Sequence, residues 1–460
     1  MNTIIQQISE NFIKNIYDFF EKGNIDINFI EEKFLDEAKT FAVKATQAYI
    51  EHIDKEIYED KKLRKELNIV VERKNDKREF ETKIGTIRFD RTYFLNKKTN
   101  EYLYLTDQVV GLDSYARVSG GLSLSLVHAA QNMSYQKSSE FLTGGKITRQ
   151  TVMHKIRQSS PVEQKIDIKK RIDMLHIDAD EAHVTLCGGK KTIVPLISVY
   201  EGIEYKGKRG ICKNIFHISE YGKTPNDLWE QTLSEIERRY DITNTKIYLH
   251  GDGASWIKTG FEWLPNAVFV LDKYHKNKGI KSMTAGLDRN ARNAFDKEIR
   301  ECLVNEDIEF LNQLTQSLIY QIPERESKIQ KSFKYLASNI KGISICKNDI
   351  EANNGGCTEP HVSHILASRL STRPMAWGKT TLKRLSPILA NPENITLDKK
   401  IIVECEKNDI NKVRRIINKK QKIFNDKFQL AYPNQLGNIT AISNGKITSL
   451  YSALKQFAKS

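Results

Sequence analysis

The chain has 460 residues, of which 39% are hydrophobic, enough for two to four domains with at least one sizeable core. No run approaches the roughly 18 consecutive apolar residues of a membrane span, and the first residues lack a signal-peptide pattern. Lys and Arg outnumber Asp and Glu by 72 to 58, a net charge of +14 spread along the chain, which favours nucleic acid as a partner over charge that serves solubility alone.

The first hundred residues are predicted to change from helices to strands. Residues 1–66 carry apolar side chains at helical spacing, with a second helix from about Asn28 to Lys62. In residues 67–110, apolar and polar side chains alternate, which predicts a small antiparallel sheet with basic residues on one face. That face suits a DNA backbone and suits solvent equally well.

Residues 111–165 are predicted to hold a helix-turn-helix that binds DNA. Two short helical patterns flank the pair Gly144-Gly145, and Thr148 is a good N-cap for the second helix. That helix would present outward four side chains suited to phosphates and base edges: Arg149, Gln150, His154 and Lys155. Because many helical hairpins bind nothing, this prediction leans on the overall charge.

The rest of the chain is predicted to be an RNase H-like core with an insertion. Apolar patterns indicate a strand meander, then alternating helices and strands, in the order β-β-β-α-β-α-β; the strands cover 175–186, 192–200, 211–218, 246–249 and 266–271. The segments expected are the first part of the core (170–282), a helical insertion (283–350), the last part of the core (351–395) and a basic helical C-terminal region (396–460). The fold class is therefore α/β and multidomain, with a mixed sheet in the catalytic core.

Acidic residues follow the pattern of two predicted strands. Alternation places His176, Asp178 and Asp180 on one face of the first strand. Right-handed crossovers put the strand that ends at Asp252 parallel beside it, so Asp180 and Asp252 would be neighbours able to hold Mg²⁺. Two such ions about 3.5–4 Å apart can clamp the attacking and leaving oxygens of a phosphoryl displacement. A third acid must come from later in the chain, and Glu359 is the best candidate.

These assignments leave alternatives. Asp178 competes with Asp180 for the first position, and Glu351 competes with Glu359 for the third. A lone Asp after a strand is most often a turn former, and Asp252 between two glycines fits that interpretation.

The cysteines give a weaker pattern. They lie far apart, which is typical of reduced thiols in the cytoplasm. A zinc site built from Cys346, Cys357, His361 and His364 lacks the usual CxxC spacing.

Three segments carry a resemblance to a known family: Asp178-Ala-Asp-Glu-Ala-His183, His250-Gly-Asp-Gly-Ala254 and the run from Gly356 to Met375. Together they resemble bacterial insertion-sequence transposases of the ISLre type, which are DDE transposases related to those of mutator-like elements. The similarity extends over nearly the whole chain.

The resemblance implies roles for particular residues. Asp180, Asp252 and Glu359 would be the DDE triad, with the helical insertion between the second Asp and the Glu. Asp272 and His275, in Asp-Lys-Tyr-His, would be the Cys/Asp-x-x-His signature that supports the active site. Pro360 departs from the small residue expected after the Glu.

The function implied is that of a DNA transposase that binds terminal inverted repeats and catalyses strand cleavage and strand transfer with two Mg²⁺ (or Mn²⁺) ions. Its partners would be element-end DNA, target DNA and at least one further copy of the chain, in the bacterial cytoplasm at the nucleoid. Two alternatives stay open: a DNA-binding protein or regulator derived from a transposase but catalytically inactive, and an RNase H-like nuclease that cleaves without strand transfer.

Overall fold

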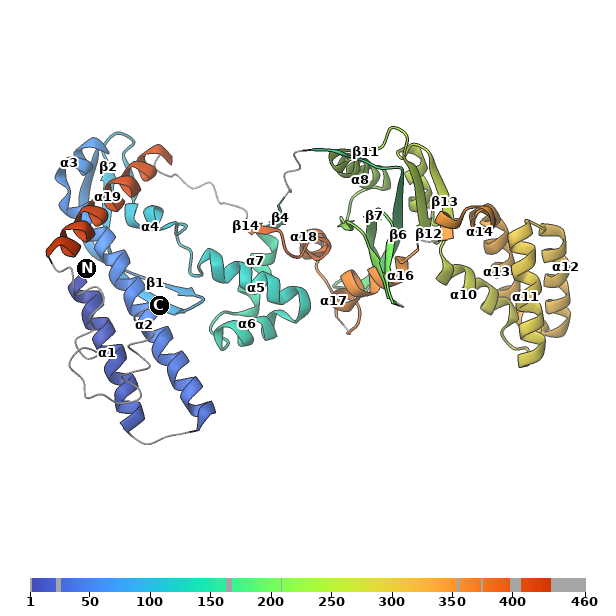
Figure 1. The fold of residues 1–460 in the computed structure, drawn as a ribbon, viewed down its shortest axis with the longest axis horizontal. Coiled ribbons are helices and arrows are strands. Elements are labelled where there is room, and N and C mark those ends of the chain that lie inside the picture. Colours follow the sequence, from blue (N-terminus) through green and yellow to red (C-terminus); the bar gives the residue numbers. More distant parts are fainter. Residues whose placement is uncertain are drawn as a thin grey trace. The chain divides into compact units, whose positions relative to one another are not determined.

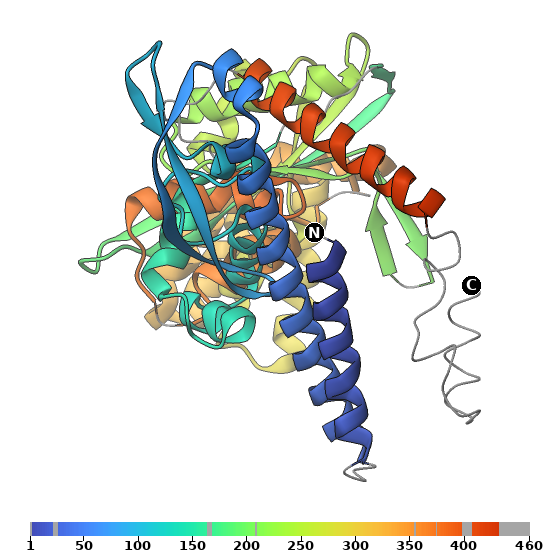
Figure 2. The same cartoon turned by 90° about the vertical axis from the view of Figure 1, so that its left-hand side faces the viewer.

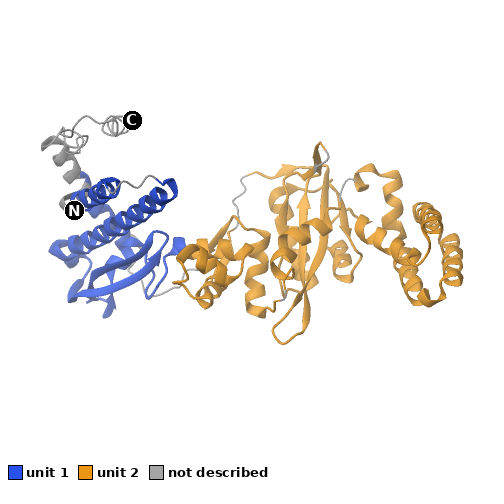
Figure 3. Ribbon diagram, turned by 90° about the horizontal axis from the view of Figure 1, so that it is seen from below, with its two compact units in different colours: residues 1–122, 399–460 blue, residues 123–398 orange. Residues whose placement is uncertain are grey.

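The computed structural model of residues 1–460 is a mixed α/β protein with several small sheets. The described residues are 2–21, 26–162, 168–207, 209–353, 356–373, 375–397 and 407–431. They fall into two compact units, residues 1–122 with 399–460, and residues 123–398 (Figure 3). No helix within the described ranges combines the length and apolar character needed to cross a bilayer. The predicted C-terminal region lies partly outside the described residues.

The first unit packs helices against a three-stranded antiparallel sheet. Figure 2 shows α1 and α2 side by side, with the β1–β2 ribbon next to α2. Its elements are α1 (Asn2–Glu21), α2 (Ile27–Glu59), α3 (Lys61–Glu66), β1 (Ile69–Thr82), β2 (Gly85–Asn96), β3 (Glu101–Leu103), α4 (Leu105–Val110) and α19 (Lys407–Ala431). The helices predicted in 1–66 and the small antiparallel sheet predicted in 67–110 are present, whereas the helix α4 was not predicted.

The sheet of this unit does not expose all of its basic residues. Arg78 and Arg91 are each only 8% exposed, and both form ion pairs with the buried carboxylate of Asp107. These two guanidinium groups neutralise an internal acid, so they add nothing to a DNA-facing surface. Other basic side chains, such as those of Arg73 and Arg88, remain exposed.

The helical pair predicted as a helix-turn-helix is present as α6 (Tyr135–Thr143) and α7 (Arg149–Arg157), after α5 (Gly120–Asn132). Gly144 ends α6 in the left-handed conformation, and the Thr148 hydroxyl accepts a hydrogen bond from the Thr151 N–H at 3.2 Å. On α7 the side chains of Arg149, Gln150 and His154 are exposed, and that of Lys155 is half-buried.

The second unit is built on a five-stranded sheet of order β10-β7-β6-β12-β13 (Figure 1). Its strands are β6 (Met174–Thr185), β7 (Lys191–Tyr200), β10 (Phe216–Ile218), β12 (Lys246–Gly251) and β13 (Ala267–Leu271). β7 is antiparallel to both of its neighbours, whereas β12 is parallel to β6 and to β13. The predicted parallel pairing of the first and fourth strands is confirmed.

The third predicted strand differs from the structure. Its first half is β9 (Arg209–Cys212), which pairs with β8 (Ile203–Lys206) in a separate hairpin. Only β10 joins the main sheet. Asn214 separates the two halves with a φ of 48°, a left-handed conformation that breaks a strand and that Asn tolerates. The break brings Cys212 to the end of the hairpin.

Alternation along β6 gives the sheet two different faces. Leu175, Ile177 and Ala179 point into an apolar core covered by α8 (Pro225–Arg239), where Trp229 is completely buried. Its indole N–H donates to the carbonyl of Trp256 at 2.7 Å, close to α9 (Ser255–Lys258) and the turn Thr259–Glu262. The polar residues of β6 therefore lie on the opposite face.

Residues after β13 are helical up to the last part of the core. The helices are α10 (Lys273–Thr284), α11 (Arg289–Asn305), α12 (Ile308–Gln321), α13 (Glu326–Ser338), α14 (Ile340–Asn348) and α15 (Ile350–Asn353). The helices α10 to α14 share an apolar cluster that also includes Leu271 of β13, and they gather beside the β13 edge of the sheet (Figure 1). The predicted helical content of 283–350 is confirmed, although the helices begin earlier, at Lys273.

The chain then returns to the sheet. α16 (Thr358–Val362) packs on β6 and continues through a π-helical turn (Ser363–Ala367) into α17 (Ser368–Leu370). α18 (Lys379–Ala390) packs on α7, where the Arg157 Nε donates to the Thr381 hydroxyl at 3.0 Å. Short pairs complete the unit: β4 (Ser159–Pro161) with β14 (Ile395–Leu397), and β5 (Lys170–Arg171) with β11 (Tyr240–Asp241).

Candidate functional site

Acidic side chains gather where β12 and β13 end. In the register of β6 and β12, His250 pairs with Asp178, so Asp252 follows β12 at the level of Asp180. Asp272 follows β13, and its N–H donates to the Gly251 carbonyl at 3.1 Å. Asp180 is 8% exposed and Asp272 is 3% exposed, so two carboxylates are buried in one small region.

The electrostatics of Asp180 reflect this crowding. Burial raises the pKa of Asp180 to about 7, and the charges of Asp252 and Asp272 push it further in the same direction. A hydrogen bond from the Glu181 N–H at 2.8 Å and the positive charge of His275 oppose the shift only in part. A proton or a bound cation would therefore stabilise the Asp180 carboxylate.

Glycines on both sides fix the loop that carries Asp252. A Cβ at Gly251 would lie 2.9 Å from the Ala179 carbonyl oxygen, and one at Gly253 would lie 2.7 Å from the Asn339 Oδ1. Gly253 also has a φ of +83°. The Asp252 Oδ1 accepts the Ala254 N–H at 2.8 Å, so the turn-forming role expected of this residue is present together with its position beside Asp180.

The helical insertion also holds this loop. The Tyr335 hydroxyl, on α13, donates to the Asp252 carbonyl at 2.8 Å. Burial raises the pKa of Tyr335, and the nearby carboxylates of Asp252, Asp272 and Asp180 add to the effect. This phenol therefore remains a hydrogen-bond donor.

Asp272 and His275 form one unit at the start of α10. The Asp272 carboxylate caps the helix by accepting the His275 N–H at 2.9 Å, and its second oxygen lies 2.7 Å from the His275 Nδ1. Burial alone would lower the pKa of His275, but the bond to Asp272 and the charges of Asp180 and Asp252 raise it. The protonated form of His275 is thus stabilised beside the acidic group.

Asp178 has a different role from Asp180, although both face the same way. Its Oδ1 accepts the Tyr200 hydroxyl at 3.1 Å, and its Oδ2 accepts the Cys357 N–H at 2.9 Å. The Nδ1 of His361 lies 3.3 Å from the same Oδ2. Both oxygens of Asp178 are thus engaged: Oδ2 holds the start of α16 against β6, and Oδ1 holds Tyr200 on β7, whose hydroxyl accepts the Gly356 N–H at 3.1 Å.

The two candidates for the third acid lie elsewhere. Glu359 is exposed on the first turn of α16, which packs on β6. Glu351 is on α15, two residues after Asp349, whose carboxylate bonds Lys246 at 2.5 Å where β12 begins. Among the residues that the structure describes, no three or more His, Cys, Asp or Glu side chains are arranged to hold a metal ion, so neither Glu completes such a group with Asp180 and Asp252 here.

Comparison with known proteins assigns the chain to a family. A family model described as "Uncharacterised protein family (UPF0236)" matches residues 21–408. The chain belongs to UPF0236. A UPF0236 protein of Caldanaerobacter subterraneus subsp. tengcongensis is 33% identical over 462 residues, 98% of this chain and 97% of the relative. Another from the same strain is 32% identical over 466 residues, 99% of this chain and 98% of the relative.

A buried polar stack lies next to the acidic group in this UPF0236 protein. The His176 Nδ1 is 3.2 Å from the His250 Nε2, and the His176 ring stacks with Tyr200 and Tyr248. Burial lowers the pKa of His250 to about 4, so this imidazole is neutral. The sequence singled out His176 by its spacing from Asp178, but no local signal showed that Tyr200 would join it.

Cysteine pairing also differs from the sequence-based zinc hypothesis. The Cys212 Sγ lies 3.9 Å from the His361 Nε2, and the His361 backbone N–H donates to the Cys357 carbonyl at 3.1 Å. Interaction with the Cys212 thiol lowers the pKa of Cys357 to about 7, and the same interaction raises the pKa of Cys212. Cys346 packs beside Tyr248 and Ala352 in a separate cluster, and His364 is exposed, so the four zinc candidates do not converge.

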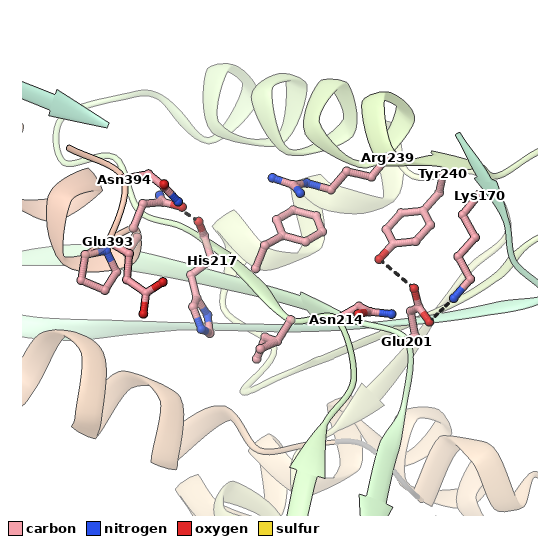
Figure 4. Close-up of a pocket in the computed structure, with 13 residues that line it drawn as sticks. Lys170, Glu201, Asn214, His217, Arg239, Tyr240, Glu393 and Asn394 are labelled. Atoms are coloured by element: carbon pink, nitrogen blue, oxygen red, sulfur yellow. Dashed lines mark hydrogen bonds and ion pairs between the residues drawn. The ribbon is translucent and has the colours of Figure 1, made fainter. Parts of the chain in front are cut away.

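A pocket of about 640 Å³ opens at the β10 edge of the sheet (Figure 4). Arg239 stacks over the Phe216 ring at 4.4 Å, and Glu201 pairs with Lys170 at 2.5 Å and accepts the Tyr240 hydroxyl at 3.2 Å. Asp180, Asp252 and Glu359 are not among its lining residues. The pocket is therefore a different surface from the acidic group.

Proposed function

We propose that this UPF0236 protein is a DNA transposase of the DDE class, which binds terminal inverted repeats and catalyses strand cleavage and strand transfer. Asp180, Asp252 and Glu359 would be its catalytic acids, supported by Asp272 and His275. The observation that carries the proposal is that Asp180 lies on β6 while Asp252 directly follows the adjacent parallel strand β12, and that burial raises the pKa of Asp180.

The sheet supports an RNase H-like core. A meander of β6, β7 and β10, followed by β12 and β13 parallel to β6, is the strand order we expect of that fold. Carboxylates on the first and fourth strands then face the same reaction centre. A helical insertion between the fifth strand and α16 agrees with the same interpretation.

The acids present suit a divalent cation. Asp180 and Asp252 supply the hard oxygen ligands that Mg²⁺ and Mn²⁺ accept, and a bound cation would offset the burial that raises the pKa of Asp180. Two such ions would activate the attacking oxygen and stabilise the leaving oxygen. The chain itself would position the scissile phosphate, with Glu359 brought in from α16 and His275 offering a positive charge on the near side.

The DNA-binding surface of the proposal is α7 together with the net charge of +14. Arg149, Gln150 and His154 are exposed on one short helix, which suits phosphate and base-edge contacts. Holding two element ends requires at least a dimer. We place this activity in the bacterial cytoplasm, at the nucleoid.

The relatives favour mobile DNA over a single-copy nuclease. The name of one relative joins eleven gene designations of one strain, and that of a second joins four. A protein family present many times in one genome is what we expect of a gene that moves together with its own coding DNA.

The test is a cleavage and joining assay. The purified full chain is incubated with DNA that carries the sequences flanking its own gene, with MgCl₂ or with EDTA. We expect Mg²⁺-dependent cleavage and joined products, a loss of at least about 100-fold in Asp252→Asn, and wild-type rates in Glu351→Gln. Cleavage by Asp252→Asn at the parent rate would refute the catalytic assignment. Binding without cleavage favours an inactive regulator, and cleavage without joining favours a nuclease.

A further inference from the structure

Two cysteines far apart in the sequence meet at the base of α16. Cys212 ends the β8–β9 hairpin, and Cys357 immediately precedes the first turn of α16. The Cys212 Sγ lies 3.9 Å from the His361 Nε2, and the His361 backbone N–H donates to the Cys357 carbonyl at 3.1 Å, so Cys357 lies one helical turn before the residue that Cys212 contacts. Interaction between the two thiols also raises the pKa of Cys212 and lowers that of Cys357. A disulfide requires the two sulfurs to approach to about 2.05 Å.

The surroundings fix the positions of Cys212 and Cys357 but leave both thiols partly accessible to solvent. Both residues are half-buried, so a small oxidant can reach them. The Asp178 carboxylate fixes the Cys357 backbone, and the hairpin pairing fixes Cys212. The other described cysteines differ: Cys187 is exposed, Cys302 is buried in the insertion, and Cys346 packs in another cluster.

We propose that Cys212 and Cys357 are a redox-active pair that forms an intramolecular disulfide linking the β8–β9 hairpin to the start of α16. The oxidant is a low-molecular-weight disulfide such as oxidised glutathione. One cysteine thiolate attacks a sulfur of the oxidant and releases one glutathione thiolate; the second cysteine attacks the mixed disulfide and releases the other. The two cysteine thiols are oxidised to one disulfide, and their two protons pass to the two released glutathione thiolates, so oxidised glutathione is reduced to two thiols.

The consequence concerns Glu359, two residues after Cys357, and rests on the proposed function. A covalent bond at the base of α16 restrains the helix that must deliver this acid to Asp180 and Asp252. Oxidation therefore acts as a lock on cleavage, and reduction releases it. The formation of the bond is independent of DNA and of catalysis.

The experiment uses the full chain, reduced, freed of metal with EDTA, and then exposed to oxidised glutathione. Free thiols are alkylated and peptides are mapped by mass spectrometry without reduction. We expect a cross-linked pair of peptides containing Cys212 and Cys357, two hydrogens lighter than their sum, which is lost in Cys212→Ser and retained in the matched control Cys346→Ser. Dithiothreitol should abolish the cross-link.

Three results would overturn the pair: both thiols alkylated after oxidation, cross-links among all cysteines without preference, or zinc in the untreated protein that protects both thiols. The lock is tested by cleavage rates, with at least a tenfold loss expected on oxidation of the parent and none in Cys212→Ser. An unchanged rate in cross-linked protein would overturn the lock. If reduced protein never cleaves, the proposed function fails, while peptide mapping still decides whether the pair exists.

Discussion

Asp178 accepts a hydrogen bond from the backbone N–H of Cys357 at 2.9 Å, so a carboxylate in the middle of β6 holds the first turn of the helix that carries Glu359. Asp180 lies two residues further on. Among the described residues, its carboxylate accepts a hydrogen bond only from the adjacent Glu181 N–H. The same strand face therefore supplies one acid that holds the structure together and one that the proposed function assigns to catalysis.

Replacing Asp178 should mainly affect stability. Asp178→Ala removes the acceptor of the Tyr200 hydroxyl and of the Cys357 N–H, both in buried surroundings. We expect a loss of about 2–4 kcal/mol in the free energy of unfolding, measured by urea denaturation. Asp178→Asn, which retains one acceptor oxygen, should lose less. Equal stability of Asp178→Ala and the parent would contradict this structural role.

In the absence of metal, replacing Asp180 should instead stabilise the folded protein. The folded protein keeps Asp180 protonated up to a pH near 7, whereas the unfolded chain releases this proton near pH 3.8. The folded state thus holds more protons between these values, and the free energy of unfolding falls as pH rises through the window. At pH 8 in EDTA, Asp180→Asn should be more stable than the parent by on the order of 2–4 kcal/mol. At pH 4 the difference should vanish; a constant difference at both pH values would count against burial as its cause.

Divalent cations should stabilise the acidic group directly. Binding to Asp180 and Asp252 in the folded state alone raises the melting temperature by mass action. We expect about 2–6 °C with millimolar MnCl₂ or MgCl₂ in a thermal-shift measurement. KCl at equal ionic strength is the control for screening. The shift should be absent in Asp180→Asn and in Asp252→Asn, and its persistence in both variants would place the cation elsewhere.

The Gly-Asp-Gly loop offers a matched pair of substitutions. Gly253→Ala meets both a φ of +83° and the Asn339 Oδ1 at 2.7 Å, whereas Gly222→Ala meets a φ of +87° with nothing within 4 Å. We expect Gly222→Ala to lose about 1 kcal/mol of stability and Gly253→Ala about 2–4 kcal/mol, since only the latter also displaces a neighbour. Cleavage should fall only in Gly253→Ala. Equal costs for the two variants would show that the Asn339 contact is unimportant.

Exposed residues of α7 should set affinity for DNA. Arg149→Ala should weaken binding about tenfold and reduce the salt slope by about 1, because one phosphate contact is lost. Lys334→Ala, which removes the same charge from an exposed site on α13, is the control. Fluorescence anisotropy at several salt concentrations separates the two. Equal effects of the two substitutions would indicate that DNA affinity depends on the net charge and not on a specific surface of α7.

Local patterns explain why much of the fold was predictable. The strands β6, β7, β12 and β13 each carry their own apolar alternation or run, and the handedness of crossovers sets β12 beside β6. The third strand was misjudged because one residue, Asn214, turns left-handed in the middle of an apolar pattern. That conformation is stabilised by the hairpin around it, where the Lys213 N–H bonds the Gly202 carbonyl.

For the site, the sequence predicted which residues share a face of β6, but it did not predict which contacts each of them makes. Spacing put Asp178 and Asp180 on one face, but the choice between them depends on Cys357, which is remote in the sequence and whose N–H occupies Asp178. The contact of Cys212 with Cys357 likewise depends on where a hairpin ends. Contacts of this kind join residues that are distant in the sequence, so they produce no local periodicity from which they could be predicted.

The bond from Tyr335 to the Asp252 carbonyl, with Asn339 packed on Gly253, makes the helical insertion part of the frame that holds the Asp252 loop. A shortened protein in which 283–350 is replaced by a flexible linker would retain every acid of the sheet, yet it would lose the two side chains that set the angle at which Asp252 leaves its strand. Minimal versions of this core should therefore keep α13, and circular permutation or tag insertion is better placed in the exposed Gly188-Gly189 turn between β6 and β7.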